Sequence, residues 1–148
     1  ERLLRWLKPG GHMLFTDYCQ SSQPLSPVSR TILVGLRCSD DLRHVRAEQE
    51  FADYIHQRQY SLLDPESYGT IVGAAGFEEV AVEDRTEQMV ACMRKELAAI
   101  KTDAAAQAFK ADFGADDYTT LLSGWESKLA WAGAGDFKWA LITAKKPS

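Results

Sequence analysis

Tyr54 and Arg58 are a pair of residues whose types and spacing suit the binding of an anion. They lie four positions apart in a stretch without Gly or Pro, so both side chains fall on one face of a helix. A guanidinium offers a planar set of charged donors for phosphate or carboxylate, and a tyrosine hydroxyl adds a neutral donor. Taken alone, such a tyrosine is more often part of the core, and such an arginine is more often a solvated charge.

The other reactive residue types form no catalytic or metal-binding pattern. Three histidines are scattered, with no partner of a suitable type three or four positions away, so we expect no metal site. Cys19, Cys38 and Cys92 are odd in number and lack C-x-x-C spacing, which argues against a disulfide framework and a zinc site. We expect Cys19 and Cys92 to be small buried residues. No G-x-S-x-G sequence is present.

The helix that must carry the Tyr54–Arg58 pair is predicted over residues 39–59. The next helix is predicted to begin at Asp64, an N-cap residue followed by proline, and to end at a glycine cap, Gly76. Further helices are expected over residues 1–8, 86–100 and, in pieces, 101–135, with breaks at Gly114 and Gly124.

Three strands are predicted between these helices. Residues 12–18 are mostly apolar and follow a Pro-Gly-Gly stop, which favours a buried strand. Residues 77–84 alternate apolar and acidic, as a half-exposed strand does, and residues 138–145 form the last strand. Residues 31–36 are compatible with a strand or with a buried turn of helix. The layout resembles the C-terminal half of a doubly wound α/β domain, and further strands are expected upstream, because such sheets usually have about 4–6 strands.

Composition narrows the class of protein. The chain has 148 residues, 45% of them hydrophobic and 26% charged, which fits one globular domain. Its net charge of −4 argues against a dedicated nucleic-acid binder, and no apolar run is long enough to span a membrane. Cysteine usage favours a reducing compartment, so we expect a cytoplasmic protein. The chain begins inside an amphipathic pattern without Met, and we interpret residues 1–148 as a piece of something longer.

An ordered series of motifs gives the chain a closer resemblance. Residues 7–11 and the strand after them are similar to the stretch before the fifth strand of class I S-adenosylmethionine-dependent methyltransferases. The whole series resembles the phosphoethanolamine N-methyltransferases, and the resemblance covers nearly everything except about residues 22–49. The motifs that carry it are residues 16–19, 51–60, 64–68, 75–77, 83–88 and 124–128, and Trp139.

The resemblance implies a function and an incomplete domain. The family methylates phosphoethanolamine stepwise to phosphocholine, with S-adenosylmethionine as the cofactor. Residues 1–148 would be the substrate-binding half of one catalytic domain, an α/β fragment lacking the N-terminal strands. The family's glycine-rich cofactor loop, its ribose-binding acidic residue and its tyrosine–histidine pair have no counterpart here. We therefore assign no catalytic or cofactor-binding residue, and we expect the chain to need the missing N-terminal half for activity and to be marginally stable alone.

The same resemblance implies a phosphate site. Methyl transfer to nitrogen requires an amine that has lost a proton and is held in line with the methyl group. The phosphate is a handle away from the reacting atoms, and it favours charged and neutral donors. The positions that match the family's phosphate pocket are Tyr18, Tyr54, Arg58, Tyr60 and Lys128. Spacing supports Tyr54 and Arg58 independently, and Tyr60 is expected just past the end of their helix.

Residues 22–49 depart from the family pattern. We interpret them as an insertion or loop, either a real lid or surface loop or a segment wrongly retained in a gene model.

Two other functions also stay open. The chain could belong to a class I methyltransferase for another small-molecule acceptor, or to a non-catalytic domain that binds a phosphobase.

Overall fold

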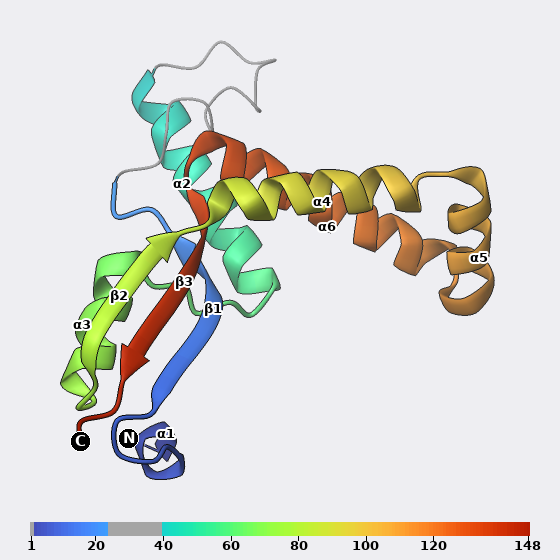
Figure 1. Cartoon of the computed structure of the whole chain (residues 1–148). Coiled ribbons are helices and arrows are strands. Elements are labelled where there is room, and N and C mark those ends of the chain that lie inside the picture. Colours follow the sequence, from blue (N-terminus) through green and yellow to red (C-terminus); the bar gives the residue numbers. More distant parts are fainter. Residues whose placement is uncertain (1, 24–39) are drawn as a thin grey trace.

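In the described part of the chain, three strands form one sheet, with the last of them in the sequence in its centre (Figure 1). The computed structural model describes residues 2–23 and 40–148. The strands are β1 (His12–Gln20), β2 (Glu78–Asp84) and β3 (Phe137–Lys145), in the order β1-β3-β2. β3 is antiparallel to both neighbours, so β1 and β2 run parallel to each other. The three predicted strand positions are thus confirmed, whereas residues 31–36 lie outside the described residues.

The prediction that the first strand is buried was wrong. Within the described residues β1 pairs through its ladder with β3 alone, and all its residues except Cys19 are exposed or only partly buried. Leu14 on this strand is 67% exposed. The physical reason is that an apolar run of this length fits an edge strand as well as a central one, and strand order is not encoded in the run itself.

Six helices are described, and their positions largely match the prediction. They are α1 (Arg2–Trp6), α2 (Asp40–Gln57), α3 (Pro65–Ala74), α4 (Thr86–Ile100), α5 (Asp103–Phe113) and α6 (Ala115–Ala134). The cap of α3 is confirmed, because the Asp64 carboxylate accepts a hydrogen bond from the Ser67 amide at 2.9 Å. Gly76 follows this helix with a φ of 98°, a conformation that glycine adopts without strain. The described helices include none that is long and apolar enough to cross a membrane.

The predicted helix break at Gly124 was wrong. Gly114 does separate α5 from α6, with a φ of 95°. Gly124, however, is buried inside α6, a helix of 20 residues that runs through it without a break. A glycine in a helix interior costs only about 1 kcal/mol relative to alanine, and packing along the rest of the helix outweighs that cost. Figure 1 shows α4 and α6 side by side in an arm, with α5 at its far end.

The alternation of β3 divides the core between the two faces of the sheet. On one face, Ala140, Ile142 and Ala144 pack with Cys19 and with residues of α3. On the other face, Phe137 packs with Phe51 of α2 and Trp131 of α6. Neighbouring residues on a strand point to opposite faces, so Tyr18 belongs to the α2 and α6 side while Cys19 belongs to the α3 side. The predicted burial of Cys19 is confirmed.

Candidate functional site

The five residues predicted to bind phosphate come together on the α2 and α6 side of the sheet. Their ring and cation contacts form a continuous chain, from Lys128 of α6 through Tyr18 of β1, Tyr60 and Tyr54 to Arg58. Four of these residues are partly buried and Arg58 is exposed. We call this group the tyrosine–cation cluster. The assembly brings two positive charges and three phenol hydroxyls from three separate segments to one place.

The turn after α2 places Tyr60. The Tyr60 amide donates to the Ile55 carbonyl at 3.0 Å, and the Gln59 amide donates to the His56 carbonyl at 3.0 Å. Gln59 has a φ of 54°, so this left-handed residue ends the helix in the manner of a Schellman cap. The chain therefore folds back, and the Tyr60 ring lies 6.3 Å from the Tyr54 ring. The expected place of Tyr60, just past the helix end, is confirmed.

Lys128 is the best-connected cation of the cluster. Its Nζ donates to the Tyr18 hydroxyl at 2.9 Å and lies 4.3 Å from the centre of the Tyr18 ring and 5.5 Å from that of Tyr60. Burial by itself lowers the pKa of this ammonium, but its interactions with the Tyr18 and Tyr60 hydroxyls outweigh burial and hold the pKa above its usual value. Lys128 is therefore charged at neutral pH and suited to an anionic partner.

Phe137 forms the floor of the cluster, and the sequence motifs did not identify it. Its side chain is fully buried, and its ring lies 4.9 Å from Tyr18, 6.3 Å from Tyr54 and 6.2 Å from Tyr60. The available signal was its spacing of two from Trp139, which puts both rings on one face of β3. Trp139 indeed lies opposite Tyr18 in the strand register, with the two rings 4.8 Å apart.

The Tyr54 hydroxyl is buried and has no hydrogen-bond partner among the described residues. Burial, with the nearby Tyr60 hydroxyl, raises the pKa of Tyr54 above its usual value, so the phenol stays protonated. A buried donor without an acceptor costs free energy, and such groups in native proteins call for an explanation. An anion bound in the cluster would supply the missing acceptor.

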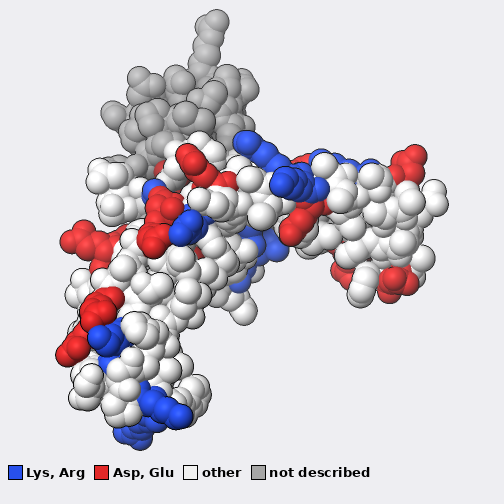
Figure 2. All heavy atoms as spheres, in the orientation of Figure 1, with Lys and Arg blue, Asp and Glu red and all other residues white. Residues whose placement is uncertain are grey.

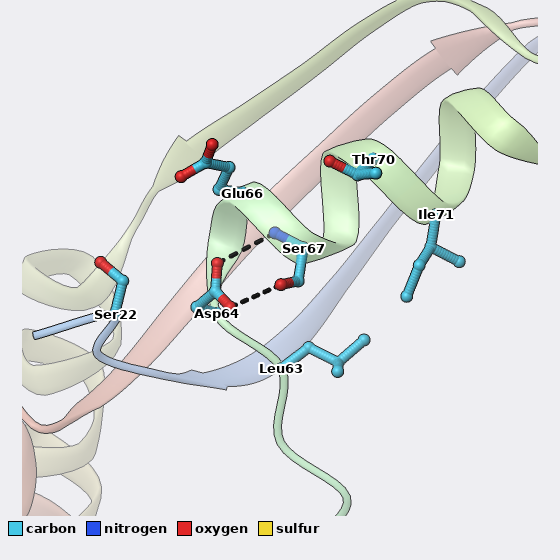
Figure 3. Close-up of a pocket in the computed structure, with 7 residues that line it drawn as sticks. All are labelled: Ser22, Leu63, Asp64, Glu66, Ser67, Thr70 and Ile71. Atoms are coloured by element: carbon cyan, nitrogen blue, oxygen red, sulfur yellow. Dashed lines mark hydrogen bonds between the residues drawn. The ribbon is translucent and has the colours of Figure 1, made fainter.

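In the part of the chain that the structure describes, two hollows lie outside the cluster and differ from it in chemistry. The first, of about 460 Å³, opens at the start of α3 (Figure 3) and is lined by Ser22, Leu63, Asp64, Glu66, Ser67, Thr70 and Ile71. Hydrogen bonds from Ser67 lower the pKa of the Asp64 carboxyl, which therefore stays ionised and disfavours an anion there. The second, of about 370 Å³, lies between α4 and β3, where Met89, Met93 and Trp139 line it.

The expected burial of Cys92 was wrong, because this thiol is exposed on α4 and lines the second hollow. The sequence pattern places Cys92 next to the buried Met93, and a shift of one residue along a helix turns the side chain by about 100°.

In the described part of the chain, no three His, Cys, Asp or Glu residues gather as a metal site would require. On the face in Figure 2, acidic and basic side chains are interspersed.

Comparison with solved structures identifies the fold. The chain has the fold of the C-terminal part of a class I S-adenosylmethionine-dependent methyltransferase. Phosphoethanolamine N-methyltransferase 2 of Haemonchus contortus, solved with phosphomonomethylethanolamine and S-adenosylhomocysteine, matches with a TM-score of 0.74 and 29% identity, over 99% of this chain and 29% of that one. A putative sarcosine dimethylglycine methyltransferase from Galdieria sulphuraria, 14% identical, matches with a TM-score of 0.70 and supports the fold alone.

Comparison with curated proteins is more specific. The chain is 38% identical to phosphoethanolamine N-methyltransferase 3 of Arabidopsis thaliana and 39% identical to phosphoethanolamine N-methyltransferase 1 of Triticum aestivum, each over 146 residues. These alignments cover 99% of this chain, and the chain spans about a quarter of the length of both relatives. The predicted resemblance to phosphoethanolamine N-methyltransferases is therefore confirmed. No family model matches the chain.

Proposed function

We propose that this chain supplies the substrate-binding half of a methyltransferase that transfers methyl groups from S-adenosylmethionine to the nitrogen of phosphoethanolamine and its methylated forms, towards phosphocholine. The observation that carries the proposal is the tyrosine–cation cluster, in which Arg58 and Lys128 are joined by three tyrosines. The similarity to phosphoethanolamine N-methyltransferases supports it over the whole chain.

The chemistry of the cluster suits a dianionic phosphate. Arg58 offers a planar fork and Lys128 a compact charge, so the two cations match the two negative charges of the ligand. The hydroxyls of Tyr18, Tyr54 and Tyr60 add donors without adding charge. Hydrogen bonds that involve a charged partner contribute about 1.5–3 kcal/mol each, enough for a small ligand to be held by this end alone.

Holding the phosphate has a consequence for the reaction. A substrate fixed at one end loses most of its freedom to turn, so its amine is presented in one direction. The described residues offer no group that we assign to S-adenosylmethionine or to removal of the amine proton. We place both functions in the part of the relatives that this chain does not cover, with the cofactor supplying the methyl group when bound. Residues 1–148 then act only together with that part. Residues 22–49, most of which lie outside the described residues, are an insertion or loop.

The proposed compartment is the cytoplasm. Cys19 and Cys92 are free thiols on opposite sides of β3, and free thiols persist where the surroundings are reducing. Phosphobases are also small charged metabolites that do not cross a bilayer unaided. Fractionation of the source cells, followed by detection of the protein, would check this part of the proposal.

The deciding experiment is calorimetric titration of phosphoethanolamine into the natural protein that contains this chain, with S-adenosylhomocysteine present. We expect binding to weaken about 10- to 100-fold in Arg58→Ala, because a charge-assisted contact is lost. Arg5→Ala serves as the control, since Arg5 is exposed on α1 at the other end of β1, and binding should not change.

The other outcomes of this titration point to other functions. A folded protein that binds S-adenosylhomocysteine but no phosphobase would be a methyltransferase for a different acceptor. Phosphobase binding without methyl transfer, in a product assay run alongside, would indicate a non-catalytic domain that binds phosphobases.

A further inference from the structure

The backbone conformation at Gly124 does not require a glycine. It lies in the middle of α6, buried, and it is not among the glycines with positive φ. Alanine is the better helix former at an ordinary helical conformation, so a glycine there lowers the stability of the helix. The explanation must come from the space around the residue.

The Arg58 guanidinium occupies that space. A Cβ atom built on Gly124 would lie 2.2 Å from Nη2, 2.9 Å from Cζ and 3.1 Å from Nη1 of Arg58, and these are its three nearest neighbours. The first two distances are too short for any real contact between these atoms, so an alanine would move the guanidinium. The displaced group is the end of a long and exposed side chain, so the fold itself can tolerate the change.

The position of Gly124 on α6 adds a second point. Gly124 and Lys128 lie four residues apart and therefore share one face of the helix. The bare backbone at Gly124 lets Arg58 lie against the face from which Lys128 projects toward Tyr18. Gly133 on the same helix offers a contrast, because a Cβ added there would meet nothing within 4 Å.

We infer that Gly124 is a positioning residue for the phosphate site: its missing side chain seats the Arg58 guanidinium against α6, beside the Tyr54 ring and on the Lys128 side. The residue touches no substrate and acts through Arg58. This inference rests on the proposed function, because it concerns how Arg58 presents its donors to the phosphate of the substrate. It assigns a role in substrate affinity to a position where helix propensity alone would favour alanine.

The test compares four variants of the natural protein by titration with phosphoethanolamine, with S-adenosylhomocysteine present, and by thermal unfolding. Gly124→Ala should bind about 5- to 50-fold more weakly, with a Tm equal to or above that of the wild type. Gly133→Ala, the matched control, should raise the Tm and leave the affinity within about twofold. Adding Gly124→Ala to Arg58→Ala should change the affinity by less than about twofold, because the group that Gly124 seats is then absent.

Three results would overturn the inference. One is an affinity of Gly124→Ala within twofold of the wild type. Another is an equal loss when the substitution is made in the Arg58→Ala background. The third is a Gly124→Ala protein that does not fold, since the residue would then be needed for the structure. An Arg58→Ala protein that binds as tightly as the wild type would instead refute the proposed phosphate site, and the role of Gly124 with it.

Discussion

The ammonium of Lys128 lies 2.9 Å from the hydroxyl of Tyr18, although 110 positions separate the two residues. The contact joins α6 to β1 across the face of the sheet on which Phe137 lies. Lys128 also lies over the Tyr18 ring, at 4.3 Å from its centre, so the ring face and the hydroxyl both favour the positive charge. This pair fixes one end of the tyrosine–cation cluster, so we expect a substitution within it to change how tightly the cluster binds an anion.

Replacing Lys128 with methionine should weaken phosphoethanolamine binding by about 10- to 100-fold. The substitution keeps the unbranched apolar stem of the side chain and removes the charged donor, worth about 1.5–3 kcal/mol with an anion. Stability should fall slightly, by about 0.5–1 kcal/mol, because the hydrogen bond and ring contact with Tyr18 outweigh the loss of hydration of the half-buried ammonium. Titration calorimetry and thermal unfolding of the natural protein measure the two effects.

Lys101→Met is the matched control for this prediction. Lys101 forms an exposed ion pair with Glu126 at 2.6 Å, and exposed pairs contribute little. Its replacement should leave the affinity within about twofold. An equal loss of affinity in both variants would mean that general surface charge, and not the Lys128 contact, attracts the substrate.

Tyr54→Phe should separate binding from stability. The Tyr54 hydroxyl is buried without a partner in the described residues, so its removal should leave the Tm unchanged or raise it. If the hydroxyl donates to the phosphate, affinity should fall about 10- to 100-fold, the loss expected for one hydrogen bond to a charged acceptor. Binding as tight as in the wild type would remove Tyr54 from the site.

Tyr118→Phe should show the opposite pattern and serves as its control. The Tyr118 hydroxyl donates to the Ile100 carbonyl at 3.2 Å and ties α6 to α4. Its loss leaves that carbonyl without this donor, so the free energy of unfolding should fall by about 1 kcal/mol. Phosphobase affinity should be unchanged, since Tyr118 lies ten residues before Lys128 on α6, about 15 Å away along the helix.

Asp84→Asn should lower stability at neutral pH but not in strong acid. Burial raises the pKa of the Asp84 carboxyl, but hydrogen bonds from Lys138 and Thr86 outweigh burial and hold the pKa below its usual value. When the pKa of a carboxyl group is lower in the folded than in the unfolded protein, its negative charge stabilises the fold. This stabilisation is complete above the unfolded-state pKa of about 3.9, and it is lost as the pH falls through the folded-state pKa. The two proteins should differ by about 0.5–1 kcal/mol from pH 5 to 8, and the difference should shrink below about pH 4.

The pH dependence of unfolding in denaturant measures this effect, and Lys138→Met tests its cause. The Lys138 ammonium lies 2.8 Å from the Asp84 carboxylate. Without that partner, the substitution at Asp84 should cost less above about pH 4, where the carboxylate is charged. A difference between wild type and Asp84→Asn that persists unchanged to pH 2 would show that the carboxylate charge is not its origin.

Cys92 should react with a thiol reagent much faster than Cys19. Cys92 is exposed on α4, whereas Cys19 is fully buried. Burial, reinforced by the charge of Asp17, raises the pKa of the Cys19 thiol to about 11, so almost no thiolate forms at pH 8. Peptide-resolved mass spectrometry after a brief treatment should find Cys92 modified and Cys19 intact until denaturant is added. Rapid modification of Cys19 in the native protein would contradict this assignment.

Local signals in the sequence determined most of the elements. Asp64 and the proline after it fixed the start of α3, because a cap bonds to an amide three residues away. Tyr54 and Arg58 were placed on one face of a helix by their spacing alone, and the structure keeps them in contact, with the Arg58 guanidinium 5.9 Å from the Tyr54 ring centre. Each of these inferences needs only residues within about one helical turn of each other.

The tertiary structure decided the rest. Strand order makes β1 an edge strand in the described sheet, and helix packing leaves Cys92 exposed and places Gly124 against Arg58. The contact of Lys128 with Tyr18 depends on the path of α6 across the sheet. None of these features repeats with the period of a helix or a strand, because each arises from segments far apart in the chain. The sequence alone therefore determined which residues share a helix face, and only the folded chain decided which faces meet.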